Sequence, residues 1–214
     1  MTMQQQVSTP EQTDYRLRPA TYEDIPAMVE FFNRRNRKLF GRDTATEQNL
    51  RDEFDEPDFD LDRSTRVAVG ADDVPVGYIE CHDTRPMPVR PFLWVCIDPD
   101  VDNDAVGKLL FDWAIPRAHD VLERVPDHAR VVIESGAEAR DAETSQVLAN
   151  VGFTNAERGF LKMAIDLTEE PSMPELPEGF TMRHGLVDDD SDLRAIFAAK
   201  QASFADHRGH VEIT

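Results

Sequence analysis

The sequence predicts an α/β domain, followed by the start of a second unit that resembles the beginning of the first. Two segments, 76–83 and 92–97, have the alternating or continuously apolar composition of strands. Before and after these segments lie stretches whose apolar residues are spaced three and four apart, which is the periodicity of helices. Hydrophobic residues make up 40% of the 214-residue chain, as in globular proteins. A folded α/β core is therefore expected.

The elements follow one another with short connections. Thr21 is placed to cap the first helix, whose first turn is acidic, and the apolar run 92–97 suits a strand buried on both faces. Pro116 is expected to kink or interrupt a long helix, and Gly152 to end a later one. In chain order we expect a strand at 15–19, helices at 23–35 and 46–55, strands at 64–70, 76–83 and 92–97, a helix at 104–124, a buried strand at 130–134, a helix at 141–150, and two last strands within 152–167 that bend around 157–159.

The domain boundaries follow from composition. Residues 1–14 are polar and are expected to be a disordered tail, and 168–177 form a linker rich in proline and glutamate. Beyond it the chain restarts, because 180–197 aligns without gaps with 15–32, which places Arg183 opposite Arg18 and Asp189 opposite Asp24. We therefore expect one domain at 15–167 and a partial second repeat at 178–214. If the chain ends at Thr214, this fragment docks on the first domain or is exchanged within a homodimer.

Charge and apolar content exclude several classes of protein. A formal net charge of −19 argues against nucleic acids and anionic membrane surfaces as partners. No apolar run approaches the ~20 residues that a membrane span needs, and the polar N-terminus has no secretory signal. Cys81 and Cys96 are isolated and are expected to be reduced thiols. These features favour a cytoplasmic protein.

The segment DPDVDNDAVGKLL, at 98–110, allows two interpretations. Aspartates at every second position suggest a calcium loop, whereas a loop that opens a helix after a strand can hold phosphate. The calcium interpretation fails because Asn103, Val106 and Leu109 occupy positions 6, 9 and 12, where an EF-hand needs glycine, an oxygen ligand and glutamate. The histidines of HRGH, at 207–210, have no cysteine or carboxylate cluster beside them, so no metal site is predicted.

The order of these elements over 15–167 resembles the GCN5-related N-acetyltransferase (GNAT) family. The tandem arrangement looks like the two-domain branch that includes mycothiol-synthase-like proteins. The resemblance implies a mixed, mainly antiparallel sheet flanked by helices, and acetyl-CoA as cosubstrate. In such proteins the strand that corresponds to 92–97 offers backbone groups to the pantetheine arm, which implies roles for Val95, Cys96 and Ile97.

The family holds the pyrophosphate with the amides of a (Gln/Arg)-x-x-Gly-x-(Gly/Ala) loop at the start of the next helix. The matching cofactor-binding residues here are Asp102, Asn103, Asp104, Ala105, Val106 and Gly107, with Lys108 beside them. Gly107 fits the motif, whereas Asp102 stands in place of glutamine or arginine. A second family motif ends in a tyrosine that protonates the departing thiolate, and its tyrosine and asparagine positions hold Leu148 and Asp141 here.

The resemblance implies transfer of an acetyl group from acetyl-CoA to a primary amine of a small molecule or peptide, by direct attack. Glu134, at the end of the predicted strand 130–134, and Glu80, within 76–83, are the candidate catalytic bases. The departures at Asp102, Leu148 and Asp141 leave an alternative open. In that alternative, this copy is a degenerate GNAT lobe that binds or supports a partner without catalysis.

Overall fold

The computed structural model describes residues 15–85, 87–154, 159–161, 163, 165–186 and 188–206. The chain divides into two units, Met1–Gly159 and Phe160–Thr214, and each is treated by itself. The tail predicted at 1–14 and the histidine motif at 207–210 lie outside the described residues. In the described part of the chain, no helix is long and apolar enough to cross a bilayer.

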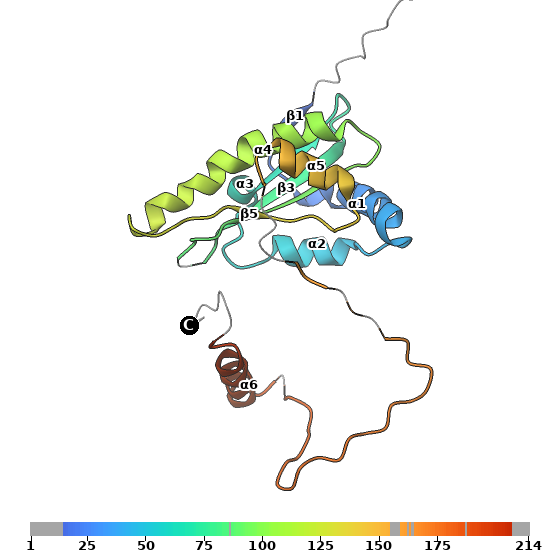
Figure 1. The fold of residues 1–214 in the computed structure, drawn as a ribbon, viewed down its shortest axis with the longest axis vertical. Helices are drawn as coiled ribbons and strands as arrows, with labels where there is room; N and C mark the ends of the chain where they lie inside the picture. The colour runs from blue at the N-terminus through green and yellow to red at the C-terminus, as the bar shows by residue number, and fades with distance from the viewer. Residues whose placement is uncertain are drawn as a thin grey trace, which may run out of the picture. The chain divides into compact units, whose positions relative to one another are not determined.

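The first unit is built on a five-stranded sheet in the order β1-β2-β3-β4-β5. Its first four strands pair antiparallel, and β5 pairs parallel to β4. The sheet is therefore mixed and mainly antiparallel, as expected (Figure 1). The strands are β1 (Arg16–Arg18), β2 (Thr65–Val69), β3 (Pro75–His82), β4 (Phe92–Ile97) and β5 (Glu134–Ser135).

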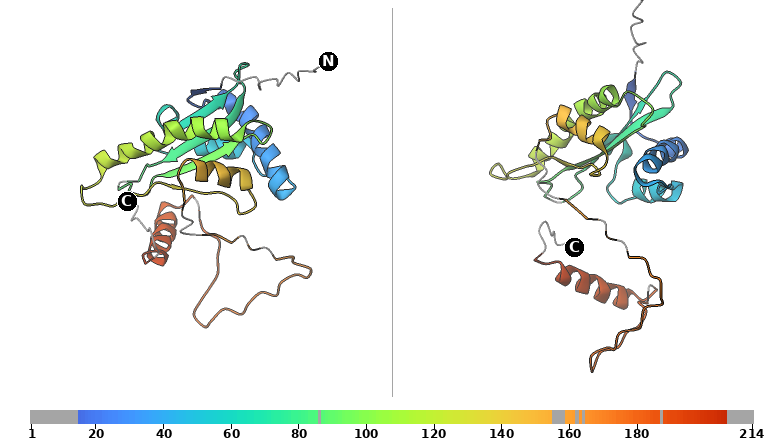
Figure 2. Two further views of the ribbon diagram at one scale, coloured as in Figure 1. Left: turned by 45° about the horizontal axis from the view of Figure 1, so that its top comes forward. Right: turned by 45° about the vertical axis from the view of Figure 1, so that its right-hand side comes forward.

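Helices cover both faces of this sheet, as Figure 2 shows: α4 and α5 lie on one face, and α1 and α2 on the other. Side chains of β3 and β4 alternate between the two cores, so Ile79 and Val95 face α4 while Tyr78 and Cys96 face α1. The helices of this unit are η1 (Tyr22–Asp24), α1 (Ile25–Phe40), α2 (Glu47–Phe54), α3 (Leu61–Ser64), α4 (Asn103–His119), η2 (Asp120–Arg124) and α5 (Ala142–Asn150).

Local sequence explains where these elements begin and end. Thr46, Asp102 and Asp141 each accept a hydrogen bond from the amide three residues on, and so cap α2, α4 and α5. Gly152 has φ +100° just after α5, which confirms the expected end of that helix. Pro116 does not interrupt α4, which continues to His119 before the turn tightens into η2.

The prediction of a buried strand at 130–134 is largely wrong. Only Glu134 and Ser135 join the sheet; residues 131–135 are half-exposed and Arg130 is exposed. The amide of Val132 donates to the Val89 carbonyl at 3.0 Å, and that of Glu134 to the Pro91 carbonyl at 2.9 Å. The segment therefore runs beside the connection that precedes β4, and no described strand covers its outer side.

The two last strands predicted within 152–167 are not formed among the described residues of that stretch. Their apolar side chains are exposed, with Leu161 at 90% and Met163 at 92%. A strand needs a neighbouring strand to be stable, and no described residue of this stretch joins the sheet. The first unit consequently ends at Gly159, before the predicted domain end at 167.

The second unit contains one helix among its described residues, α6 (Asp190–Ser203). The predicted linker, 168–177, has no helix or strand, as expected. The residues that align with β1, at 180–186, also form no strand, and none of α6 is buried. Within residues 180–206, the exposed large apolar side chains are Phe180, Met182, Leu186, Leu193, Ile196, Phe197 and Phe204.

Candidate functional site

The open edge of β4 is the first feature of the site. The amide of Asp98 donates to the Val76 carbonyl at 2.9 Å, so alternate residues of β4 direct their backbone groups toward β3. Val95 and Ile97, which lie between them, direct theirs to the other side, where the ladder with β5 contains two residue pairs and ends at Leu93–Ser135. The carboxyl half of β4 therefore presents backbone groups beside a short strand. The sequence analysis assigned Val95, Cys96 and Ile97 to the pantetheine arm; of these, Cys96 directs its backbone groups toward β3 instead.

The predicted phosphate loop forms the N-terminus of α4, as its sequence indicated. Asp102 caps the helix, and its carboxylate already accepts a hydrogen bond from the Ala105 amide at 3.1 Å. Asn103 and Asp104 form the first helical positions, and Asp104 accepts a hydrogen bond from the Asn150 side chain at 3.0 Å. The amides of these two residues precede the intrahelical ladder, so they remain able to meet an anion.

Two small or apolar residues of the motif are explained by packing. A Cβ on Gly107 would lie 2.4 Å from Val147, so the glycine lets α5 approach α4 closely. Val106 is fully buried and stands against Gly77 of β3, where a Cβ would lie 2.6 Å from it. Lys108 pairs with Asp112 one turn later on the exposed side of α4. Gly107 thus has a structural reason that is independent of any phosphate.

Basic residues of α1 compensate the acidic loop. Arg34 pairs with the buried Asp98 and lies 3.8 Å from Asp100, and Arg35 pairs with Asp141. A cavity of about 140 Å³ lies at the ends of these elements. Its lining residues are Arg35, Lys38, Leu39, Ile97, Pro99, Asn103, Arg140, Asp141, Ala142, Glu143 and Thr144, so the N-termini of α4 and α5 meet three cationic side chains there. The sequence analysis did not identify these cations.

A larger cavity of about 300 Å³ lies between α4 and α5. Asp104, Lys108 and Asn150 are on its wall together with apolar side chains, and Glu80 is not among its lining residues. This cavity is therefore separate from the site of Glu80 on β3.

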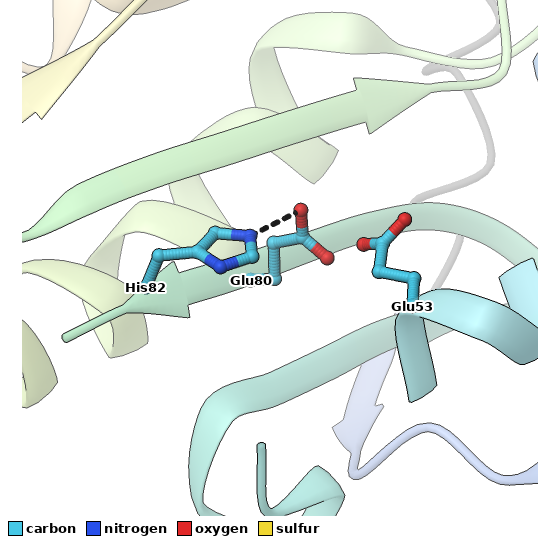
Figure 3. Close-up of side chains that lie close together, drawn as sticks. All are labelled: Glu53, Glu80 and His82. Atoms are coloured by element: carbon cyan, nitrogen blue, oxygen red, sulfur yellow. Dashed lines mark hydrogen bonds and ion pairs between the residues drawn. The ribbon is translucent and has the colours of Figure 1, made fainter. Parts of the chain in front are cut away.

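That cluster combines Glu53 of α2 with Glu80 and His82 of β3, and Figure 3 shows the Glu80 carboxylate between the other two side chains. The His82 ring lies 2.8 Å from Glu80 through Nε2, and the Tyr78 hydroxyl donates to Glu80 at 2.7 Å. Phe59 stacks on the His82 ring, with 5.3 Å between ring centroids. His82 is half-buried and hydrogen-bonded.

The two carboxyl groups of this cluster have opposite ionisation. Burial, together with the hydrogen bond to Glu80 and its charge, raises the pKa of Glu53 to about 9. Burial also opposes charge on Glu80, but the hydrogen bonds from His82, Glu53 and Tyr78 outweigh it and lower the pKa of Glu80. The hydrogen bond to Glu80 raises the pKa of His82. Near neutral pH the cluster therefore holds one protonated carboxyl beside one carboxylate.

Glu80 differs from the other buried acids of the described residues in its partners. Asp24, Asp83, Asp98 and Asp141 each form an ion pair with an arginine. Glu80, which is only 4% exposed, has no arginine or lysine among its described partners. Because a buried carboxylate is normally paired with an arginine or lysine, one whose basic partner is a histidine is the strongest indication of a functional group among the described residues.

The remaining candidates are placed as follows. Glu134 lies on β5, pairs with Arg90 and is half-exposed, so β4 separates it from Glu80. Leu148, at the tyrosine position of the motif, is buried in the core beneath α5 and cannot transfer a proton. Glu53, Glu80 and His82 also offer three ligand atoms within 4.8 Å of one another, which is a donor set that divalent metals use.

Comparison with known proteins concerns the fold. No family model matches the chain, and no curated protein matches it. Among solved structures, a GCN5-related N-acetyltransferase from Sphaerobacter thermophilus is similar with a TM-score of 0.67 and 20% identity, over 87% of this chain and 57% of that one. The chain thus spans little more than half of that protein, and the alignment extends beyond Gly159 into the second unit.

Two further structures are similar over less of the chain. A putative phosphinothricin N-acetyltransferase has a TM-score of 0.50 and 15% identity, over 65% of this chain and 82% of that one. YncA from Salmonella typhimurium, described as a putative acetyltransferase and solved with its cofactor acetyl-CoA, has a TM-score of 0.49 and 19% identity, over 65% of this chain and 79% of that one. With its mixed five-stranded sheet between two layers of helices, the chain has the fold of the GCN5-related N-acetyltransferases.

Proposed function

We propose that the protein is an N-acetyltransferase that transfers an acetyl group from acetyl-CoA to a primary amine of a small molecule or peptide. The observation that carries this proposal is the carboxylate of Glu80, which is buried and ionised, has no arginine or lysine among its described partners, and lies on β3, the strand that pairs with the other edge of β4. The fold shared with N-acetyltransferases supports it. Tandem organisation, with the second unit as a partial repeat, and dimerisation remain part of the proposal.

Three features of the chain suit acetyl-CoA. Backbone groups of Val95 and Ile97 face the open side of β4 and would bind the pantetheine arm. The first amides of α4 and the helix dipole would hold a phosphate, with Lys38 and Arg140 supplying positive charge from the wall of the 140 Å³ cavity. The Ala105 amide is not free to bind a phosphate, because it already donates a hydrogen bond to the Asp102 carboxylate.

In the reaction, acetyl-CoA supplies an activated acetyl carbonyl. Glu80 accepts a proton from the acceptor's amino group, and the nitrogen bonds to the acetyl carbon. The carbon–sulfur bond breaks, and the sulfur leaves as a thiolate that takes a proton from solvent, since Leu148 cannot donate one. His82, which is half-exposed and bonded to Glu80, would pass the proton from the buried carboxylate to the surface.

Titration of the full chain with acetyl-CoA in a calorimeter, together with an acetylation assay on simple amines, tests the proposal. Glu80→Gln is expected to bind acetyl-CoA like the parent and to lower acetyl transfer by about 10²–10⁴-fold. Lys38→Ala combined with Arg140→Ala should weaken acetyl-CoA binding by about tenfold and reduce its salt dependence. Lys200→Ala, an exposed lysine of the second unit, is the control. No heat at millimolar acetyl-CoA would exclude the enzyme.

The second candidate function is a non-catalytic GNAT lobe. The hydrogen bond between Asp102 and the Ala105 amide favours it, because one amide of the phosphate loop is satisfied within the loop itself. An Asp102→Ser variant still caps the helix but removes the negative charge. If the parent chain does not bind acetyl-CoA and Asp102→Ser does, the degenerate lobe is the correct interpretation.

A further inference from the structure

The pair formed by Glu53 and Glu80 is more than the base that acetyl transfer needs. Their carboxyl oxygens lie within 4.8 Å of one another, on two different elements, α2 and β3. Two carboxylates so close in a partly buried site repel each other, so a positive charge or a proton has to lie between them. In the free protein a proton serves this purpose.

Other charged groups around the pair do not replace that proton. Glu56, just beyond α2, adds negative charge, and Tyr78 contributes only a hydroxyl. His82 is the one basic group bonded to Glu80 among the described residues, and it meets the oxygen that is not bonded to Tyr78. Asp83 acts on His82 and is itself paired with arginines.

We propose that Glu53 is the specificity-determining residue of the acceptor site: the ammonium group of the acceptor binds between Glu53 and Glu80 and displaces the proton held there. The acceptor class is then primary alkylamines that are cationic at neutral pH. This inference rests on the proposed acetyl transfer. It goes beyond it because it assigns a residue that no motif contains and a charge that the acceptor must carry.

The surroundings of the pair suit an alkylammonium group. Trp94 of β4 lies directly opposite Glu80 in the sheet register, on the same face, and is half-buried. Its ring packs against Phe32, with 5.2 Å between centroids, which holds it in place. An alkyl chain could therefore lie along this aromatic wall while its ammonium group meets the carboxyls.

The proton count follows from this arrangement. An ammonium group that enters the site releases the Glu53 proton to solvent, and both carboxylates then face one cation. For the transfer step, Glu80 takes one proton from the ammonium to give the free amine, which attacks the acetyl carbon. The second proton that the nitrogen loses goes to Glu53, so the pair ends with its proton restored and one further proton to release.

Calorimetric titration of the full chain with butylamine, in the presence of coenzyme A, tests the binding step without turnover. Repeating it in buffers of different ionisation enthalpy measures the protons released. The parent should release close to one proton per amine at neutral pH, and Glu53→Gln none. The affinity difference between the two should grow as pH rises from 6 toward 9, because Glu53 loses its proton more readily as pH rises and glutamine has none to lose. His82, whose pKa is also raised, is present in both proteins and titrates in both.

Asp52→Asn is the matched control, since it removes one carboxylate from the exposed position of α2 that precedes Glu53. It should release protons like the parent. Equal proton release by the parent and Glu53→Gln would overturn the inference. So would a zinc titration that binds and releases the proton where butylamine does not, because the cluster would then be a metal site.

An activity comparison separates this inference from the proposed function. Trifluoroethylamine is largely uncharged at neutral pH, so Glu53→Gln should lower kcat/KM for butylamine by about tenfold or more and leave trifluoroethylamine nearly unchanged. Equal loss on both amines would refute the role of Glu53 while leaving acetyl transfer intact. Failure of the parent to bind acetyl-CoA would refute the proposed function instead, and the butylamine titration would still decide the role of Glu53.

Discussion

The chain builds similar turns before α1 and before α6, yet only α1 is covered by a sheet. In the first turn, Arg18 donates hydrogen bonds from both Nη atoms to the Asp24 carboxylate at 2.7 and 2.6 Å. Its Nη1 also donates to the Pro19 carbonyl at 3.2 Å. Asp24 in turn accepts a hydrogen bond from the Thr21 amide at 2.8 Å. The carboxylate thus accepts from the arginine and from the amide three residues after that arginine, while the arginine also donates to the carbonyl of the residue that follows it.

The second turn repeats each of these contacts. Arg183 donates to Asp192 and to the His184 carbonyl, and Asp192 accepts a hydrogen bond from the Leu186 amide at 2.7 Å. The arginine, the next carbonyl and the amide three residues on again share one aspartate. Short-range contacts of this kind need no sheet, which is why they occur in both units.

The structure corrects the gapless alignment of the two turns. That alignment placed Asp189 opposite Asp24, but Asp192 makes the contacts of Asp24, so the second turn is three residues longer. Asp189 instead caps α6 by accepting hydrogen bonds from the Ser191 and Asp192 amides. With this shift Met28 of α1 corresponds to Ile196 of α6.

Burial is where the two turns differ. Met28 is fully buried between α1 and the sheet, whereas Ile196 is 48% exposed. The comparison teaches that a helix of this fold can form from its own caps and ion pairs, but gains its packing energy only from strands distant in sequence. The second unit therefore has a helix with its preceding turn, and none of the helix is buried.

Removing the buried side chain gives the largest expected effect. Met28→Ala should lower the free energy of unfolding by about 2–5 kcal/mol, and Ile196→Ala should change it by less than about 0.5 kcal/mol. Urea unfolding followed by the fluorescence of Trp94 and Trp113, which both lie in the first unit, measures this. A large loss in Ile196→Ala would mean that something covers α6.

Breaking the ion pair of each turn comes next. Asp24 is buried, and Asp24→Asn should destabilise the first unit by about 1–3 kcal/mol because Arg18 and the Thr21 amide lose a charged acceptor. Asp192→Asn changes an exposed pair and should leave the urea midpoint of the first unit unaltered. An equal shift of that midpoint in both variants would show that the units unfold together.

Lowering the pH should remove part of the stabilisation that the ionised Asp24 gives the first unit. Burial opposes charge on Asp24, but the hydrogen bonds from Arg18 and Thr21 prevail and lower the pKa of Asp24. A lowered pKa stabilises the fold above the ordinary aspartate value of about 4, and this is lost as pH falls below it. The stability difference between the parent and Asp24→Asn should therefore shrink from pH 6 to pH 3. A constant difference would assign the effect to packing.

The smallest effect should come from the cap of α6. Asp189→Ala should cost about 1 kcal/mol of local helix stability, because the Ser191 and Asp192 amides lose their acceptor. Hydrogen exchange of the α6 amides should then be about fivefold faster, while amides of α1 exchange as before. Unchanged exchange in α6 would indicate that contacts other than the cap hold this helix.

The candidate site was only partly predictable from sequence. Glu80 was named because its strand borders the expected cofactor strand, and Asp102–Gly107 because the segment follows a strand and opens a helix. Glu53 was missed since nothing in its helix marks it, and its role depends on meeting Glu80 from another element. The cations Lys38 and Arg140 were missed for the same reason: they reach the cavity from elements far apart in the chain.

The sequence by itself determined the α/β class, the three central strands and the end of α5 at Gly152. All of these depend on periodicity or on residues close in the chain, so local chemistry is sufficient. Only the tertiary structure decided which apolar segments are covered and which buried acid lacks an arginine. Those outcomes depend on which distant segments pack together, and that is why Phe160, Leu161, Met163 and Ile165 remain exposed while Glu53 comes to share a proton with Glu80.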